Sequence, residues 1–359
     1  MTTPWPAGVI DPHIHLWDPL TTPRATSKLA RVFRPLPRVP RAMRWVAPQT
    51  DREFAGHPHH LLKPYLPLDH HADAAEVPVA TIVHIESEWG EERRDSVDET
   101  RWLISLPFSQ DGAPALGALV VHADPRFDDA GAILDEHLAV SPLVRGVRCV
   151  AAHHPDPGVR DFADQPHLLS DPAFVKGFAA IAERGLSFEM WCFSHQLPDA
   201  LTLAQEYPET TFVLDHYATP VGLLGPRGKT TGRTAKERST LLATWREDVA
   251  ALAALPNVVA KHSGLGMPLL GSNRSRPLAA DAVSEMTDQV APLIRHVHDI
   301  FGADRTMWAS NFPIDKAELT LPATLRIVTD VLGSDADLTK LVRDVARRVY
   351  RIQDEGDLT

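Results

Sequence analysis

Cysteine is scarce in this chain of 359 residues, which contains only Cys149 and Cys192. Two cysteines cannot build the disulfide framework that holds small secreted domains together. The chain also lacks an apolar run long enough to span a bilayer, and residues 1–8 carry neither the basic region nor the apolar stretch of a signal peptide. We therefore expect a cytoplasmic protein with no membrane partner.

Positive charge is also in short supply. The chain has 36 lysines and arginines against 47 acidic residues, which gives a net charge of −11 at pH 7. Nucleic-acid binding usually needs a basic face, so we expect no nucleic-acid partner. The apolar share of 44% is enough for a sizeable core. The composition therefore indicates an ordinary globular protein, and its acidity alone argues for solubility and not for a function.

Two common catalytic motifs are missing. No Gly-x-Gly-x-x-Gly turn follows any of the predicted strands, which argues against a dinucleotide-binding sheet. No Gly-x-Ser-x-Gly elbow is present, and no base stands beside either cysteine in the sequence. Covalent catalysis by serine or cysteine therefore has no support.

The sequence does contain a regular alternation of short apolar runs and helix-like segments. Strands are predicted over 9–16, 80–86, 115–121, 144–150, 186–193, 211–215, 257–261 and 305–309. Helices are predicted over 96–106, 128–140, 196–207, 235–254 and 279–301, with one more opened by Asp171-Pro172 and two near the C-terminus. Eight such units predict an α/β fold, a (β/α)8 TIM barrel in one domain over 1–359. A doubly wound open sheet is the alternative.

A long insertion, about 21–77, separates the first two strands and is rich in proline, arginine and histidine. Its run Arg-Val-Phe-Arg-Pro-Leu-Pro-Arg-Val-Pro is incompatible with a regular helix. We interpret the insertion as a cover over the strand ends or as a contact in a homo-oligomer, with a partly disordered loop as the alternative. A second polar stretch, 222–233, is predicted to be a mobile lid.

A His-x-His pair stands at the end of the first strand. His13 and His15 are two residues apart, so in an extended strand both imidazoles point to one face. His216 follows the sixth strand, and the chemistry of such barrels sits at the carboxyl ends of the strands. Three imidazoles there form a candidate zinc-type metal site with an open position for water. The alternatives are two surface histidines and a single hydrogen-bonded His216 beside Asp215, which the alternation turns to the other face.

Carboxylates are the next candidates for catalysis. Glu86 shares a face with His84 at the end of the second strand and is a candidate ligand or base, whereas Glu88 is expected to be solvated. Glu189 reads either as a buried carboxylate with a raised pKa or as a polar residue of the barrel core. Where the eighth strand ends, the chain has Asn311, which can orient water but cannot accept a proton. Asp315 comes four residues later.

Three further side chains are candidates for substrate binding. Arg148, at the end of the fourth strand, could fork onto a substrate carboxylate or pair with a loop aspartate. Lys261 could polarise a carbonyl or pair with an acid inside the barrel. Trp191 shares a face of the fifth strand with Glu189. We therefore predict Arg148, Trp191 and Lys261 as contacts to a small, carboxylated substrate, and Asn311, Glu86 and His216 as catalytic residues.

Taken together, these motifs resemble the amidohydrolase superfamily, in its amidohydrolase 2 branch of metal-dependent TIM-barrel hydrolases. The matching stretches are Asp-Pro-His-Ile-His-Leu-Trp at 11–17, Leu-Ser-Phe-Glu-Met-Trp-Cys-Phe-Ser-His-Gln-Leu-Pro at 186–198, Val-Leu-Asp-His-Tyr-Ala-Thr-Pro at 213–220, Val-Val-Ala-Lys-His-Ser-Gly-Leu-Gly-Met-Pro at 258–268 and Met-Trp-Ala-Ser-Asn-Phe-Pro-Ile-Asp at 307–315. The branch includes lactonases of sugar acids and of 2-pyrone-4,6-dicarboxylate, and it borders decarboxylases of aromatic acids.

The resemblance implies that a cyclic ester is hydrolysed at the top of the barrel. It implies that His13, His15 and His216 bind a metal, zinc first and manganese second, or polarise the substrate carbonyl in a metal-free mechanism. In the family an aspartate after the eighth strand usually activates the water, and here Asn311 takes that place. The base is therefore open between Glu86, Glu189 and a histidine. The alternative functions are a metal-dependent decarboxylase of an aromatic or unsaturated acid and a non-catalytic binding barrel.

Overall fold

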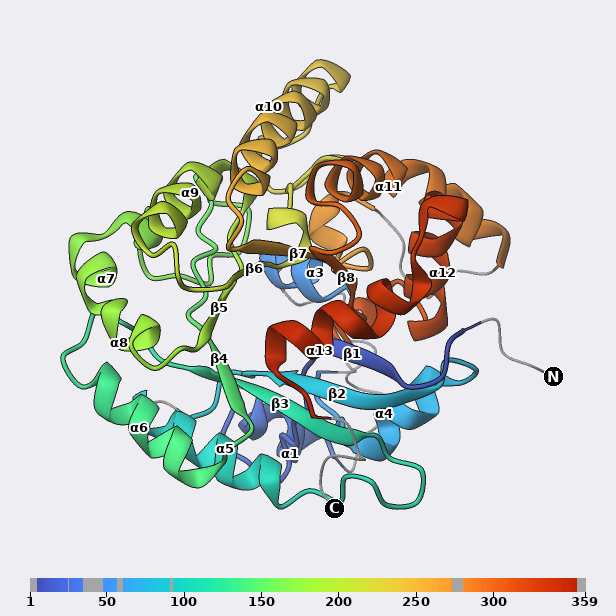
Figure 1. Cartoon of the computed structure of the whole chain (residues 1–359). Helices are drawn as coiled ribbons and strands as arrows, with labels where there is room; N and C mark the ends of the chain where they lie inside the picture. Colours follow the sequence, from blue (N-terminus) through green and yellow to red (C-terminus); the bar gives the residue numbers. More distant parts are fainter. Residues whose placement is uncertain are drawn as a thin grey trace.

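The computed structural model describes residues 5–24, 26–34, 48–56, 61–90, 93–272 and 280–353. Eight parallel strands form one sheet in chain order, and a bridge between Ile14 and Phe312 brings the first and last strands together (Figure 1). The strands are β1 Val9–Ile14, β2 Val79–Ile85, β3 Ala115–His122, β4 Val144–Arg148, β5 Ser187–Met190, β6 Phe212–Leu214, β7 Val258–His262 and β8 Thr306–Trp308. All eight predicted strands and the TIM barrel are confirmed.

Helices surround this barrel (Figure 1). They are α1 Ser27–Phe33, α3 Gln49–Ala55, α4 Pro67–Ala74, α5 Ser96–Ile104, α6 Ala130–Val140, α7 Pro172–Gly177, α8 Ala179–Ala182, α9 Leu197–Glu206, α10 Ala235–Ala253, α11 Ala280–Phe301, α12 Leu321–Leu332 and α13 Val345–Tyr350. The predicted cap of α7 is confirmed, because Asp171 accepts hydrogen bonds from the first-turn amides. None of the described helices has the length and apolar character that crossing a membrane requires.

Two apolar layers hold the barrel together. One lies inside the strands and contains Ile10, Val83, Ile85, Ala118, Val120, Val213, Val259 and Met307. Tyr350 of α13 packs among these inward side chains. The other layer lies between the strands and the outer helices and is the larger of the two. Because the inner layer fills the barrel, a substrate can reach only the strand ends.

Three described helices belong to the segment between β1 and β2. Residues 31–33 of the proline-rich run lie in α1, so the run is helical at its start, and 35–40 lie outside the described residues. His70 of α4 donates to Asp11 of β1 at 3.0 Å, and both side chains are fully buried. This buried pair fastens the segment to the first strand.

The stretch 222–233, predicted to be a mobile lid, is held in place by two carboxylates, and Glu53 accepts a hydrogen bond from the Gly228 amide at 2.7 Å. Asp156 accepts hydrogen bonds from the amides of Lys229, Thr230 and Thr231 and from both threonine hydroxyls, at 2.7 to 3.1 Å. These bonds to a charged group are individually strong. We call these hydrogen bonds the Asp156 latch. They hold the loop against the rest of the chain, whereas the sequence suggested a mobile loop.

Candidate active site

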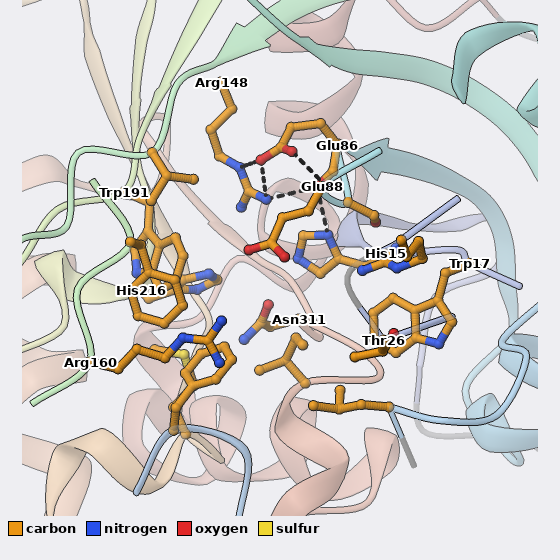
Figure 2. Close-up of a pocket in the computed structure, with 18 residues that line it drawn as sticks. His15, Trp17, Thr26, Glu86, Glu88, Arg148, Arg160, Trp191, His216 and Asn311 are labelled. Carbon is orange, nitrogen blue, oxygen red and sulfur yellow. Dashed lines mark hydrogen bonds and ion pairs between the residues drawn. The ribbon is translucent and has the colours of Figure 1, made fainter. Parts of the chain in front are cut away.

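A pocket of about 840 Å³, solvent at its mouth included, opens at the carboxyl ends of the strands (Figure 2). Its walls come from the barrel and from the segment between β1 and β2. The lining residues are His15, Trp17, Arg24, Thr26, Phe54, Leu61, Glu86, Ser87, Glu88, Arg148, Val150, Arg160, Phe162, Trp191, His216, Met267, Asn311 and Ile314. Of the predicted site residues, His15, His216, Glu86, Arg148, Trp191 and Asn311 line it.

The three predicted histidines meet at the floor of this pocket: His15 and His216 line it, and the fully buried His13 lies in contact with both. The Nε2 atoms of His13 and His15 lie 3.2 Å apart, and the ring centres of His13 and His216 lie 4.5 Å apart. Burial lowers the pKa of His216 to about 3 and holds the pKa values of His13 and His15 well below the usual 6.5. The imidazoles are therefore neutral at pH 7, each with one nitrogen lone pair to offer.

Irregular backbone brings these rings together. In β1 the register shifts between Asp11 and Ile14, so that both Ile10 and His13 face the barrel interior. After β6, His216 itself adopts a left-handed φ of 53°. A Cβ at Gly264 would lie 2.5 Å from the His216 Cβ, so only glycine leaves room for this ring.

The prediction that Asp215 points away from the site is wrong. Its Oδ1 lies 3.1 Å from His13 Nδ1 and 3.2 Å from Lys261 Nζ. Val213 already faces the barrel interior, so Asp215 follows it inward by ordinary alternation. It is His216 that breaks the alternation, through its left-handed backbone, and therefore enters the same cluster.

Lys261 lies beneath the histidines and has no exposed surface. Its Nζ donates to Glu189 Oε2 at 2.5 Å and lies 3.1 Å from His13 Nδ1. Tyr350 donates to the other oxygen of Glu189, also at 2.5 Å. Burial raises the pKa of Glu189 to about 8 despite the nearby lysine. In this position Lys261 does not reach the pocket, and Glu189 is a buried carboxyl of the barrel interior.

Glu86 and Arg148 form a buried pair at the pocket wall (Figure 2). Arg148 donates to the Glu86 carboxylate and to the Glu86 carbonyl, each at 2.8 Å. Burial raises the pKa of Glu86, but the charges of Arg148 and His122 together with the hydrogen bonds from Arg148 and the Glu88 amide outweigh this effect, and the pKa lies below its usual value. The predicted shared face with His84 is wrong, because His84 turns outward to Glu99 at 3.3 Å and β2 ends at Ile85.

Asn311 lines the pocket and Asp315 stands behind it. The Asn311 amide donates to Asp315 at 2.7 Å, and its backbone has a left-handed φ of 55°. Asp315 is fully buried, which raises its pKa to about 8, and it is not among the lining residues. The carboxyl therefore orients the amide and does not itself face the pocket.

The cluster at the floor fits a zinc-type ion. Two nitrogens that bind one tetrahedral zinc at about 2.05 Å lie about 3.3 Å apart, close to the 3.2 Å between His13 and His15. His15 Nδ1 faces the Ile85 and Glu86 carbonyls, so its proton sits there and Nε2 is left as a ligand. His13, Asp215 and His216 also offer ligand atoms within 4.8 Å of one another. The buried Asp215 Oδ2 has no hydrogen-bond partner among the described residues.

Several wall residues had no signal in the sequence. Phe54 of α3 packs on Phe162 at 4.7 Å, and Phe162 packs on Trp191 at the same distance. Arg160 lies over both phenylalanines and pairs with Asp51 at 3.1 Å. Arg24 lies 4.8 Å from the centre of the Trp17 ring. These residues lie in loops or short helices whose sequences have no periodic pattern. Their charge or aromatic character is the one sequence feature that could have suggested a role in the pocket.

Residues 10–352 match the family model described as Amidohydrolase. The chain belongs to the amidohydrolase family. This amidohydrolase is 29% identical over 347 residues to uncharacterized protein y4mH of Sinorhizobium fredii, which covers 96% of this chain and 99% of that protein. It is also 29% identical to an L-fucono-1,5-lactonase of Burkholderia ambifaria, over 62% of this chain and 67% of that one. These matches identify it as a hydrolase of the amidohydrolase superfamily.

Solved structures share the fold of this amidohydrolase. A Burkholderia multivorans amidohydrolase with bound zinc superposes with a TM-score of 0.66 at 22% identity, over 97% of this chain and all of that one. A Pseudomonas putida protein named a 2-pyrone-4,6-dicarboxylic acid hydrolase gives 0.58 at 17% identity, over 98% and 100%. The likeness confirms the barrel across nearly the whole chain.

Proposed function

We propose that this amidohydrolase hydrolyses a lactone, the cyclic ester of a sugar acid or of a dicarboxylic acid. The meeting of His13, His15 and His216 at the floor of an open pocket carries this proposal. Neutral imidazoles there can bind a metal or hydrogen-bond a developing oxyanion. The names of the relatives, a fuconolactonase and a pyrone dicarboxylate hydrolase, point to the same bond type.

His13, His15 and His216 would hold the metal, zinc in the first place and manganese in the second, with Asp215 in reach. Bound there, a divalent ion would polarise the ester carbonyl and make water more acidic. Asn311 orients the attacking water through an amide that Asp315 fixes in place. Trp191 supplies an apolar wall whose indole is held by Thr219 at 3.1 Å.

A carboxylated substrate fits the arginines of the pocket. The charge of Arg148 is already paired with Glu86. Arg148 therefore forms part of the pocket wall, and only its unused N–H groups can bind substrate. Arg24 forms no ion pair with a described residue, and Arg160 pairs with a half-exposed aspartate. These two cations are the better candidates to bind a substrate carboxylate.

An assay of acid release on a panel of sugar-acid and dicarboxylate lactones tests the proposal. The purified protein is assayed as isolated and after addition of zinc or manganese, and turnover of at least one lactone is expected. Failure on every lactone under all three conditions would contradict the proposal. Release of carbon dioxide from a parallel panel of aromatic and unsaturated carboxylic acids would instead establish the decarboxylase alternative.

A further inference from the structure

Lactone hydrolysis needs a proton acceptor, and the obvious positions do not supply one. Water must lose a proton as its oxygen attacks the ester carbon, and general-base catalysis of this step is worth about 10²- to 10⁴-fold. Asn311 cannot take the proton, because a carboxamide has no basic site near neutral pH. Asp315 holds the amide from behind and does not line the pocket.

The other carboxyls near the histidines are also occupied. Glu189 and Asp215 lie fully buried around Lys261, below the pocket. Glu86 lines the pocket, but its Oε1 accepts from Arg148 and its Oε2 accepts from the Glu88 amide at 3.1 Å. A carboxylate with a bound guanidinium is a poor base, because the arginine stabilises the charged form.

Glu88 is the remaining carboxylate of the pocket wall. Figure 2 shows its side chain reaching into the pocket, in the space that His15, His216 and Asn311 also border. The side chain is exposed, and its carboxylate forms no hydrogen bond or ion pair with a described residue. No described residue therefore occupies its acceptor positions, and water or substrate can use them.

The backbone holds Glu88 in this direction at some cost. Its φ of 54° lies in the left-handed region, which a non-glycine residue adopts only at a cost in free energy. Two contacts stabilise it: the bond from its own amide to Glu86, and a bond of 2.9 Å from the Gly90 amide to the Pro23 carbonyl. Arg24, next to Pro23, adds its positive charge to the surroundings of Glu88.

We propose that Glu88 is the general base of the hydrolysis, a role that rests on the lactonase function proposed above. The Glu88 carboxylate takes a proton from water while the water oxygen bonds to the ester carbonyl carbon. The ring C–O bond of the tetrahedral intermediate then breaks, and Glu88 returns the proton to the departing ring oxygen. One lactone and one water give one hydroxy acid, and Glu88 ends in its starting form.

Variants of Glu88 test this role in the full-length protein loaded with zinc. Glu88→Gln keeps the size of the side chain and removes the base, so kcat is expected to fall by about 100-fold or more. Glu88→Ala leaves an empty space where the carboxylate was, so added formate is expected to restore part of the activity of this variant. Formate is expected to restore no activity to Glu88→Gln, because the glutamine side chain fills that space. Glu209→Gln, a change at an exposed residue that does not line the pocket, is the control and keeps wild-type activity.

Measurement of product binding distinguishes a variant that has lost only its general base from a variant that has lost its folded structure. Quenching of the fluorescence of Trp17 and Trp191 by the hydroxy-acid product is expected to be the same in Glu88→Gln and in the wild type. Wild-type turnover of a lactone together with unchanged kcat in Glu88→Gln would overturn the Glu88 proposal and leave the lactonase function standing. No lactone turnover by the wild type would overturn both. If formate does not restore any activity of Glu88→Ala, the role of Glu88 is structural and the general-base proposal is wrong.

Discussion

The Tyr350 hydroxyl donates a hydrogen bond of 2.5 Å to Glu189, which joins the last helix of the chain to the centre of the barrel. From Glu189 the contacts continue through Lys261 to Asp215 and His13, and every one of these side chains is fully buried. A buried polar network of this kind is costly when one partner is removed, because the others keep their unmet hydrogen-bonding groups. The C-terminal helix α13 therefore supports the floor of the active site.

Tyr350→Phe should lower stability by about 1–3 kcal/mol, since it leaves one oxygen of buried Glu189 without its donor. Denaturant unfolding monitored by circular dichroism measures the change. Tyr207→Phe is the matched control: it also removes a hydroxyl that bonds to another residue, the Val175 carbonyl, but at a partly exposed position. An equal loss of stability in both variants would show that the Glu189 contact has no special weight.

Metal content should follow the histidine cluster. The wild type, incubated with zinc and dialysed, is expected to retain about one ion per chain, as one four-coordinate site requires. His13→Asn and His15→Asn should each remove most of it, because each takes away one of the two facing Nε2 atoms. Elemental analysis measures the content, with His195→Asn outside the pocket as control. A wild type that keeps no zinc would contradict the expectation.

Much of the fold was predictable from the sequence, and the reason is physical. Strands buried on both faces need continuous apolar runs, and all eight runs are strands in the structure. The polar residues at the ends of these runs then gather at one end of the barrel, and for this reason the sequence alone predicts that His13, His15 and His216 lie together.

Side-chain direction beyond the last strand residue was not predictable. The alternation rule failed for His84 with Glu86 and for Asp215 with His216, in each case where the strand ends. Left-handed backbone at His216 sets the direction of its ring, and a register shift in β1 sets that of His13, and no residue pattern encodes either feature. The pocket walls from Arg24 and Phe54 were not predicted for a similar reason, since the loop of Arg24 and the short helix of Phe54 have no periodic pattern in the sequence.

The hydrogen bonds between Asp156 and the 222–233 loop should make a contribution to the free energy of unfolding that is lost in acid. Five backbone and hydroxyl donors of the loop and the Gly158 amide hold the Asp156 carboxylate, and its pKa lies well below the usual value because these bonds outweigh the effect of burial. A lowered folded-state pKa gives stability that is present above the unfolded pKa of about 3.9 and is lost as the pH falls toward the folded value. Asp156→Asn should therefore cost on the order of 3 kcal/mol at pH 7.

Unfolding of the wild type and of Asp156→Asn should be compared at pH 7 and at decreasing pH below 4. The difference between the two proteins should shrink as the wild-type carboxylate is protonated. Asp128→Asn, at an exposed position, controls for the general loss of one negative charge. A difference that stays constant with pH would mean that the latch does not depend on the charge of Asp156.

The arginine that rests on Trp17 should distinguish charged from uncharged substrates. Arg24→Met keeps the length and the apolar stem of the side chain and removes the cation. If Arg24 binds a carboxylate, KM for a carboxylated lactone should rise by about 10- to 100-fold, the value of one charged hydrogen bond. KM for an uncharged lactone should stay unchanged, as should both values in Arg101→Met at the surface. An equal rise for both lactones would indicate a general distortion of the pocket.

Replacement of Gly264 by alanine should be destabilising for two reasons, its left-handed backbone and the close approach of His216. Its φ is +72°, and an added Cβ would lie 2.5 Å from the His216 Cβ. Gly302 has nearly the same φ, +74°, but nothing within 4 Å of an added Cβ. Gly302→Ala therefore measures the cost of left-handed backbone alone, about 1 kcal/mol. Gly264→Ala should cost more in unfolding experiments, and it should also lose zinc, because His216 must move. Equal stability and equal zinc content in the two variants would show that His216 is free to shift, and that the backbone after β6 does not fix its place in the cluster.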